Sequence, residues 1–328
     1  MIIADIGRAL ALASIPIASG FGTLALIQLY VVAFVTGVLT IFFDLAYLAY
    51  VPSLVGRDQL GDANAKMQVS ASIAEVSGPG LGGLLIQAIG AGRAIGADAA
   101  SFVVSFVTIA SIGGDDPSPD RTARTTSVLT ELRDGLGHVF KHPLLRSLIL
   151  TTGAAITFAH ISEPNIFPFF YRTLNLSPGT VGLIFSAAGI GGIAGAIVCR
   201  QIAARLGPGW TLALFGALMG IVVALQTVAR FGYAIPILVT ILLLAGFANS
   251  VHDVTQVSLR QSLTPDRLQG RMNSVFRTVY WGGWPLGNLL GGYVGSAFGP
   301  VNGILIGGGG LALFSLVTLL TPLRKASV

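Results

Sequence analysis

Charged residues are scarce in this chain. Asp, Glu, Lys and Arg make up only 10% of its 328 residues, whereas soluble domains contain about 25%. Hydrophobic residues make up 53%, and 43 residues are glycine. This composition excludes an ordinary soluble domain and predicts a protein that lies in a lipid bilayer.

Cysteine and the sequence motifs of several enzyme classes are also rare or absent. Cys199 is the single cysteine, so no disulfide can form within one chain, and the four scattered histidines offer no ligand spacing for a metal ion. The glycine-rich phosphate loop GxxxxGK[ST] does not occur in the sequence. We therefore expect a protein that is not an enzyme, holds no metal or cofactor and does not use ATP directly.

Long apolar stretches are present instead, and each can cross a bilayer core of about 30 Å as a helix. They must be helices rather than barrel strands, because the runs are continuous and an isolated span satisfies its backbone hydrogen bonds only when helical. The expected fold is therefore an all-α membrane protein. Its ten predicted spans are 2–22, 24–50, 66–90, 94–112, 146–170, 178–204, 210–229, 233–258, 272–297 and 302–322.

Basic residues indicate the orientation in the membrane. If residue 1 lies in the cytoplasm, sixteen Lys and Arg residues fall on the inner side and only three on the outer side. This bias follows the positive-inside rule, so we expect a multi-pass protein of the cell membrane with both termini in the cytoplasm. The net charge of +5 then reflects topology and needs no nucleic-acid partner. A short apolar core after Arg8 also fits a signal peptide, but Asp5 in the would-be basic region argues against that alternative.

The sequence contains two copies of one unit. A displacement of 209 residues places Gly37 on Gly246, Asp44 on Asp253, Gly78 on Gly287, Gly82 on Gly291, Gly83 on Gly292 and Gly90 on Gly299. Secondary transporters build a central substrate site from paired halves of this kind. The expected halves are 1–112 and 146–328, joined by a linker at 113–145. Residues 127–140 of the linker have helical spacing and form either an amphipathic helix on the inner membrane face or a solvated connector.

The two copies are unequal in length. Spans 146–170 and 178–204 of the second copy have counterparts that would lie before residue 1. The chain is therefore expected to hold four helices in its first half and six in its second, out of an expected twelve.

Several stretches carry a family resemblance. Segments 42–47 and 52–55, and then 258–261, 264–268 and 270–273, resemble inner loops of the major facilitator superfamily, in particular its branch of multidrug and siderophore exporters, which includes enterobactin and macrolide efflux proteins. Gly78, Pro79, Gly82 and Gly83 match the G-P-x-x-G-G motif that the superfamily places in its fifth helix and associates with antiporters. Proline bends a helix and glycine permits close packing, so this segment is either a hinge or a simple packing surface.

The resemblance implies a bundle whose halves rock around a central cavity. It implies a secondary active transporter, working as a monomer in the bilayer, that exports a hydrophobic or amphipathic small molecule, such as a drug or a siderophore, in exchange for protons. Ala33 stands where many proton-coupled members have an arginine, so proton coupling is not inherited from that position. Two alternatives are a truncated membrane protein that does not transport and an importer of the same fold.

Polar residues within the predicted spans are the candidate site. An ionisable side chain at membrane depth costs about 2.5–3.5 kcal/mol, so such groups usually face a cavity or a partner. Glu75, near the middle of its span, is the first candidate for a protonatable carboxylate. Asp44 and Asp253 occupy equivalent positions and are expected to pair with Arg8 and Arg277 in an inner gate, or else in static salt bridges.

Two further polar groups complete the candidate set. Asn249, Asp253 and Gln256 share one helix face, which should line a cavity or a helix contact. His160 and Glu163 lie three residues apart and bind either a proton or a substrate, or form an ordinary polar contact. Aromatic side chains are candidates for an apolar substrate pocket, namely Phe158, Phe167, Phe169, Phe170, Tyr280 and Trp281.

Overall fold

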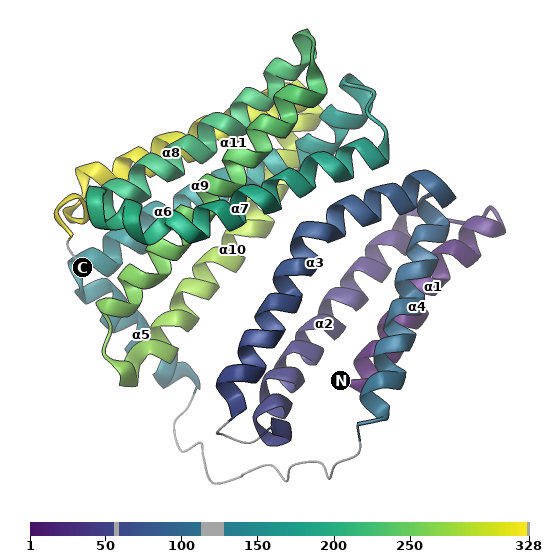
Figure 1. Cartoon of the computed structure of the whole chain (residues 1–328), viewed down its shortest axis with the longest axis horizontal. Helices are drawn as coiled ribbons and strands as arrows, with labels where there is room; N and C mark the ends of the chain where they lie inside the picture. The colour runs from purple at the N-terminus through teal and green to yellow at the C-terminus, as the bar shows by residue number, and fades with distance from the viewer. Residues whose placement is uncertain (56–58, 113–127, 327–328) are drawn as a thin grey trace. The chain divides into compact units, whose positions relative to one another are not determined.

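The computed structural model describes residues 1–55, 59–112 and 128–326, and these ranges contain helices and short connections but no strand (Figure 1). The first part of the expected linker, 113–127, lies outside them. The chain divides into two compact units, Met1–Ala123 (unit 1) and Arg124–Val328 (unit 2). Within the described ranges, nine helices are long and apolar enough to cross a membrane.

Unit 1 is a bundle of four long helices. They are α1 (Ile2–Gly20), α2 (Leu26–Val55), α3 (Leu60–Ile89) and α4 (Ala91–Ala110). Helix α1 packs chiefly against α4 and also against α2. The first apolar stretch is therefore an integral part of this bundle.

Unit 2 contains the remaining helices, several of which begin with proline. These are α5 (Val128–Lys141), α6 (Pro143–Pro168), α7 (Pro178–Leu206), α8 (Pro208–Leu225), α9 (Ala234–Ser262), α10 (Asp266–Phe298) and α11 (Pro300–Val317). Proline suits the first helical turn because its missing N–H would have no partner there. Helix α7 packs on α9, α6 packs on α10 and α11, and α8 packs on α11.

Helices α5 and α10 differ from the apolar spans. Helix α10 has 33 residues, the longest run of the described chain, but it is not among the nine apolar candidates. Its Gly, Asn and Arg residues make it less apolar, and four of its residues, Arg277, Tyr280, Trp281 and Trp284, line the cavity described below. Helix α5 packs on α10, where Val139 is fully buried in a core that includes Met272 and Phe276.

The structure repeats the sequence duplication. The order α1 to α4 matches α8 to α11, and the pairing of α1 with α4 matches that of α8 with α11. Gly90 between α3 and α4 has φ +82° and ψ 158°, and Gly299 between α10 and α11 has φ +86° and ψ 158°. Only glycine adopts this backbone conformation readily, so both copies use one residue type to turn between the same two helices.

The matched glycines nevertheless have different surroundings. A Cβ atom at Gly246 of α9 would collide with the Ala188 carbonyl oxygen of α7, and one at Gly291 of α10 would collide with the Ile161 carbonyl oxygen of α6. Their counterparts Gly37 and Gly82 have no atom within 4 Å of the same position. The described part of unit 1 has no helices equivalent to α6 and α7, so only 6% of the apolar window of α2 is buried, against 28% in α9.

This contrast gives a test within one chain. Gly246→Leu and Gly291→Leu should each destabilise the protein by about 1–3 kcal/mol or more, because a side chain would be forced against a neighbouring backbone. The matched Gly37→Leu and Gly82→Leu variants should unfold close to the parent in thermal or detergent-driven unfolding of the purified protein. Equal losses in all four variants would show that the two halves pack alike and would contradict the assignment.

Candidate functional site

A cavity of about 500 Å³, lined by both polar and apolar side chains, lies among five helices of unit 2. Helices α6, α8, α9, α10 and α11 all contribute to its wall. Its polar and aromatic lining residues are Thr152, His160, Asn249, His252, Asp253, Gln256, Arg260, Arg277, Tyr280, Trp281, Trp284 and Ser315. Polar side chains from so many apolar helices must face this cavity, because acyl chains offer them no partners.

Helix α9 supplies the polar face of the cavity. Asn249, Asp253, Gln256 and Arg260 follow one another at helical spacing and all line it. The Asn249 Nδ2 donates to the Asp253 Oδ2 at 3.2 Å, and the Gln256 Nε2 donates to the Tyr280 hydroxyl of α10 at 2.5 Å. The α9 face is thus joined to α10 by a side-chain hydrogen bond.

Helix α6 supplies a second polar group. The Nδ1 of His160 lies 2.5 Å from the Oε2 of Glu163, and the His160 ring lies 4.8 Å from the Trp284 ring, centroid to centroid. His160 lines the cavity, whereas Glu163 does not. The structure therefore places these two residues in contact and links the pair to the cavity through the histidine.

Both cavity arginines lie against aromatic rings rather than carboxylates. The Cζ atom of Arg260 lies 5.2 Å from the Phe276 ring centroid, and that of Arg277 lies 4.9 Å from the Trp281 ring centroid. Among the described residues of unit 2, neither arginine has a carboxylate oxygen within 4.0 Å. The expected Arg277–Asp253 pair is therefore not formed in this structure.

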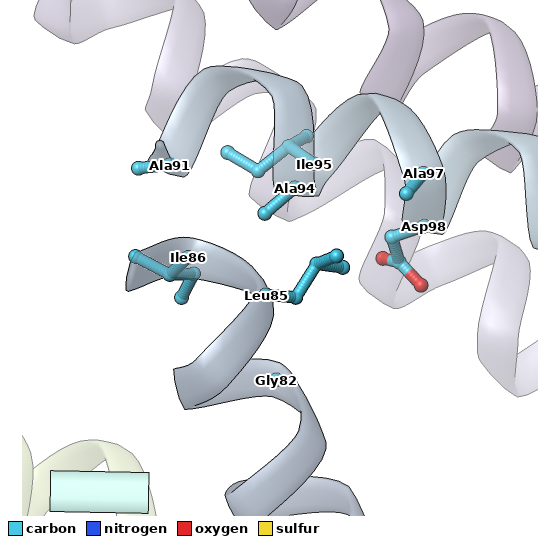
Figure 2. A pocket seen from close by; sticks show the side chains of 8 residues that line it. All are labelled: Gly82, Leu85, Ile86, Ala91, Ala94, Ile95, Ala97 and Asp98. Atoms are coloured by element: carbon cyan, nitrogen blue, oxygen red, sulfur yellow. The ribbon is translucent and has the colours of Figure 1, made fainter. Parts of the chain in front are cut away.

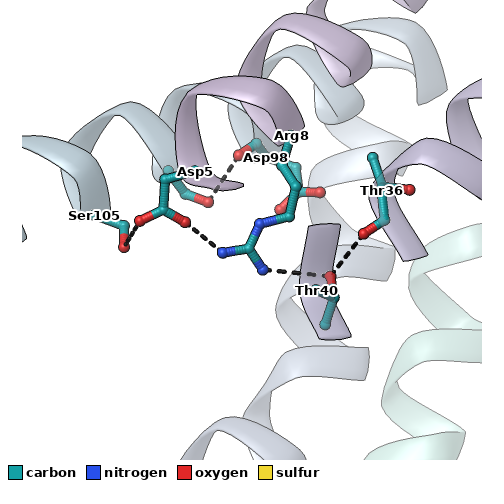
Figure 3. Close-up of polar contacts among 7 residues, drawn as sticks. Asp5, Arg8, Thr36, Thr40, Asp98 and Ser105 are labelled. Atoms are coloured by element: carbon teal, nitrogen blue, oxygen red, sulfur yellow. Dashed lines mark hydrogen bonds and ion pairs between the residues drawn. The ribbon is translucent and has the colours of Figure 1, made fainter. Parts of the chain in front are cut away.

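Arg8 in unit 1 has a different partner from the one expected. It forms an ion pair with Asp5, one turn earlier in α1, and the two residues are only 6% and 0% exposed (Figure 3). The second Asp5 oxygen accepts a hydrogen bond from Ser105 of α4 at 2.8 Å, and Arg8 donates to Thr40 of α2 at 3.3 Å. The Arg8 guanidinium also lies between two rings, 4.5 Å from Phe43 and 4.4 Å from Phe102.

The expected pair of Arg8 with Asp44 is consequently not formed either. Asp44 is exposed on α2, like its counterpart Asp253 on α9. The two arginines are also not related by the duplication, because Arg8 aligns with Ala217 and Arg277 aligns with Gln68. Any gate built from these residues would differ between the two halves.

The remaining candidates lie on α3 of unit 1. Glu75 is exposed in the middle of the helix, and Pro79 lies inside it, with Gly78 and Gly82 open to their surroundings. Gly83 is buried. The structure thus places Glu75 one turn from the proline without bringing it against the other acidic candidates of its unit.

A groove of about 450 Å³ separates α3 from α4, with Gly82, Leu85 and Ile86 on one wall and Ala94 and Asp98 on the other (Figure 2). In unit 2 the equivalent positions are occupied by contacts with α6. Gly291, for example, accepts a hydrogen bond at its carbonyl oxygen from Asn165 at 2.9 Å. The groove is therefore the unit 1 counterpart of the place that α6 fills in unit 2.

Several cavity residues are absent from the sequence-based candidate set. Arg260 stands eleven residues after Asn249, so extending the helical stripe by one more turn would have found it. Thr152 and Trp284 carry no comparable signal, because their position depends on how α6 and α10 pack. Among the aromatic candidates, Tyr280 and Trp281 line the cavity, whereas Phe169 and Phe170 are fully buried in the core.

The fold defines a multi-spanning helical membrane protein with a cavity among five helices of its second unit. The chain belongs to the Major Facilitator Superfamily, whose family model matches residues 1–287 and 164–327. This family consists in general of transporters rather than enzymes.

Curated relatives and solved structures agree with this family. The multidrug efflux pump Tap of Mycolicibacterium fortuitum is 26% identical over 304 residues, which cover 90% of this chain and 73% of that protein. The enterobactin exporter EntS of Citrobacter koseri is 27% identical over 278 residues, which cover 84% of this chain and 64% of that protein. The chain therefore spans about two thirds of the length of these relatives.

The solved structures establish the fold. A bacterial homologue of the iron transporter ferroportin in an inward-facing state superimposes with a TM-score of 0.69 at 15% identity, covering 99% of this chain and 81% of that one. A bacterial metal transporter gives a TM-score of 0.62 at 15% identity, covering 96% and 83%.

The buried Arg8–Asp5 pair generates a stability prediction. Arg8→Leu alone should cost about 3–5 kcal/mol, because it leaves the Asp5 carboxylate buried without its cation. The double variant Asp5→Leu/Arg8→Leu should recover most of that loss in detergent-driven unfolding.

The exposed Lys66–Asp62 pair of α3 serves as the control, and Lys66→Leu should change stability little. An Arg8→Leu protein as stable as the parent would contradict the conclusion that the Arg8–Asp5 pair stabilises unit 1.

Proposed function

We propose that this chain is a secondary transporter that exports an amphipathic small molecule in exchange for protons. The observation that carries the proposal is the polar chamber of unit 2, which joins hydrogen-bonding, charged and aromatic side chains among apolar helices. The export activities in the names of the related proteins Tap and EntS support the direction of transport. In this proposal the protein acts as a monomer with both termini in the cytoplasm.

The cavity residues divide between substrate and proton. Gln256, Thr152 and Tyr280 offer hydrogen bonds to a substrate, and Trp281 and Trp284 offer apolar faces. Asp253 is the proposed proton carrier, because its side chain is 62% exposed and is held by Asn249. Its protonation would remove the one negative charge on the cavity wall and so couple proton binding to substrate binding.

The duplicated architecture supports alternating access. Each unit is compact by itself, so the two halves can move as bodies while their internal contacts persist. Gly78 and Pro79 in α3 are the proposed hinge, and Glu75 beside them is a second proton carrier. His160 with Glu163 provides a third protonatable group next to the cavity.

Two other functions remain as alternatives to be separated by experiment. An importer of the same fold would move the substrate inwards, and a membrane protein that does not transport would leave its distribution unchanged. The related exporters favour the first proposal over both. Vesicles of known orientation distinguish all three, because they report the direction of net movement.

Transport in everted vesicles from cells lacking their own efflux pumps tests the proposal. Vesicles containing the protein should accumulate at least one compound from a panel of amphipathic drugs and siderophores when the lumen is acidified, and an uncoupler should abolish this uptake. Asp253→Asn should lower proton-driven uptake about tenfold or more, because the residue could no longer change charge.

The matched control is Asp62→Asn, which removes an exposed carboxylate outside the cavity and should leave uptake unchanged. Full proton-driven uptake by Asp253→Asn would exclude the coupling role of that residue. No uptake of any compound, with the protein present in the membrane, would contradict the export function itself.

A further inference from the structure

The cavity of unit 2 has an unbalanced charge. Its wall carries two guanidinium groups, from Arg260 and Arg277, but only one carboxylate, from Asp253. That carboxylate is already held by Asn249 at 3.2 Å and lies 3.5 Å from the Nδ1 of His252. With neutral histidines the lining therefore has a net positive charge.

The two arginines retain capacity to bind an anion. The Nε atom of Arg260 is buried and has no hydrogen-bond partner, although the guanidinium lies beside the Tyr280 hydroxyl. Arg277 lies against the Trp281 ring, and its charge repels that of Arg260. Two guanidinium groups that share one cavity, with no carboxylate of unit 2 in contact with either, indicate a ligand that supplies the negative charge.

Unit 1 shows how the same fold treats an arginine that needs no ligand. Arg8 also lies against aromatic rings, but Asp5 neutralises it and both side chains are buried. The arginines of the unit 2 cavity have the aromatic contact without the acid. Arg8 therefore has a structural role, whereas the positive charges of the cavity arginines remain available to bind a ligand.

We infer that the cavity selects organic anions with an aromatic body, and that Arg260 and Arg277 bind the negatively charged group. Guanidinium binds carboxylate, sulfonate and phenolate oxygens through directed hydrogen bonds. Trp281 and Trp284 supply flat apolar surfaces on which an aromatic ring can stack. A volume of about 500 Å³ suits a drug-sized molecule of this class. This inference rests on the proposed function, since it names the substrate class of the same cavity. Because protonated Asp253 would strengthen the binding of an anion, exchange of such a substrate for protons requires the other proposed proton carriers, Glu75 or the His160–Glu163 pair.

Binding of three matched probes tests the selectivity without requiring transport. The chain has three tryptophans, so a Trp210→Phe background leaves only Trp281 and Trp284, both in the cavity, as fluorescent reporters. The nitroaromatic probes are 4-nitrobenzoate, 4-nitrobenzamide and 4-nitrobenzylamine, which differ in charge but share one quenching ring. With the full chain in lipid nanodiscs, the carboxylate should bind at least about tenfold more tightly than the amide, and the amine should bind most weakly.

Variants of the two arginines test which residues cause the preference for the carboxylate probe. Arg260→Gln and Arg277→Gln should each lower affinity for the carboxylate about tenfold or more while leaving the amide nearly unchanged. Arg277→Lys should retain part of the preference, because it keeps the charge but loses the planar donor group. The control is Arg230→Gln, since Arg230 is exposed outside the cavity and has a similar aromatic contact, 4.6 Å from Phe231.

The outcomes separate this inference from the proposed function. Equal affinities for all three probes, tighter binding of the amine, or no quenching by any probe would overturn the anion selectivity, even if vesicles transport another compound. A carboxylate preference that persists in both arginine variants would overturn the assignment of the residues. Anion binding without transport in vesicles would instead support the cavity chemistry and contradict the export function.

Discussion

The cost of holding a charged side chain at membrane depth governs how this protein uses its few charges. Each such group costs about 2.5–3.5 kcal/mol unless it faces a cavity or a partner. Unit 1 meets this constraint inside its bundle, where Arg8, Asp5 and Ser105 join α1 to α4. Unit 2 meets it around a chamber, where Arg260 and Arg277 lie against aromatic rings. The same constraint thus produces a stabilising ion pair in unit 1 and a candidate binding site in unit 2.

The two units share one helix order because the sequence is duplicated, and the cavity of unit 2 arises mostly from residues that differ between the two copies. Both halves turn between their last two helices at a glycine of the same backbone conformation, Gly90 or Gly299. In unit 2, small residues such as Gly246 and Gly291 let α7 and α6 approach α9 and α10 closely. That close packing brings polar residues of α6, α9 and α10 to one chamber.

Much of the fold could be predicted from the sequence, because apolar length and glycine register are local signals. The expected span 178–204 corresponds to α7, and the displacement by 209 residues recurs in the helix order. The grouping of Asn249 with Gln256 followed from helical pitch alone. Contacts between helices could not be predicted: the place of Tyr280 beside Gln256 depends on the approach of α10 to α9. The Asp5–Arg8 pair is different, because these residues lie three apart within α1 and helical spacing alone makes them neighbours.

Water access to the unit 2 chamber tests the central claim most directly. Cys199 is the only cysteine, so a Cys199→Ala background allows single thiols to be introduced at chosen positions. A maleimide in water reacts with the thiolate, which forms only where water reaches the sulfur. The account predicts rapid labelling of the Trp281→Cys variant in the membrane, slowed by a bound aromatic carboxylate, and little labelling of Leu313→Cys on the exposed apolar face of α11. Equally slow labelling of both variants would contradict it.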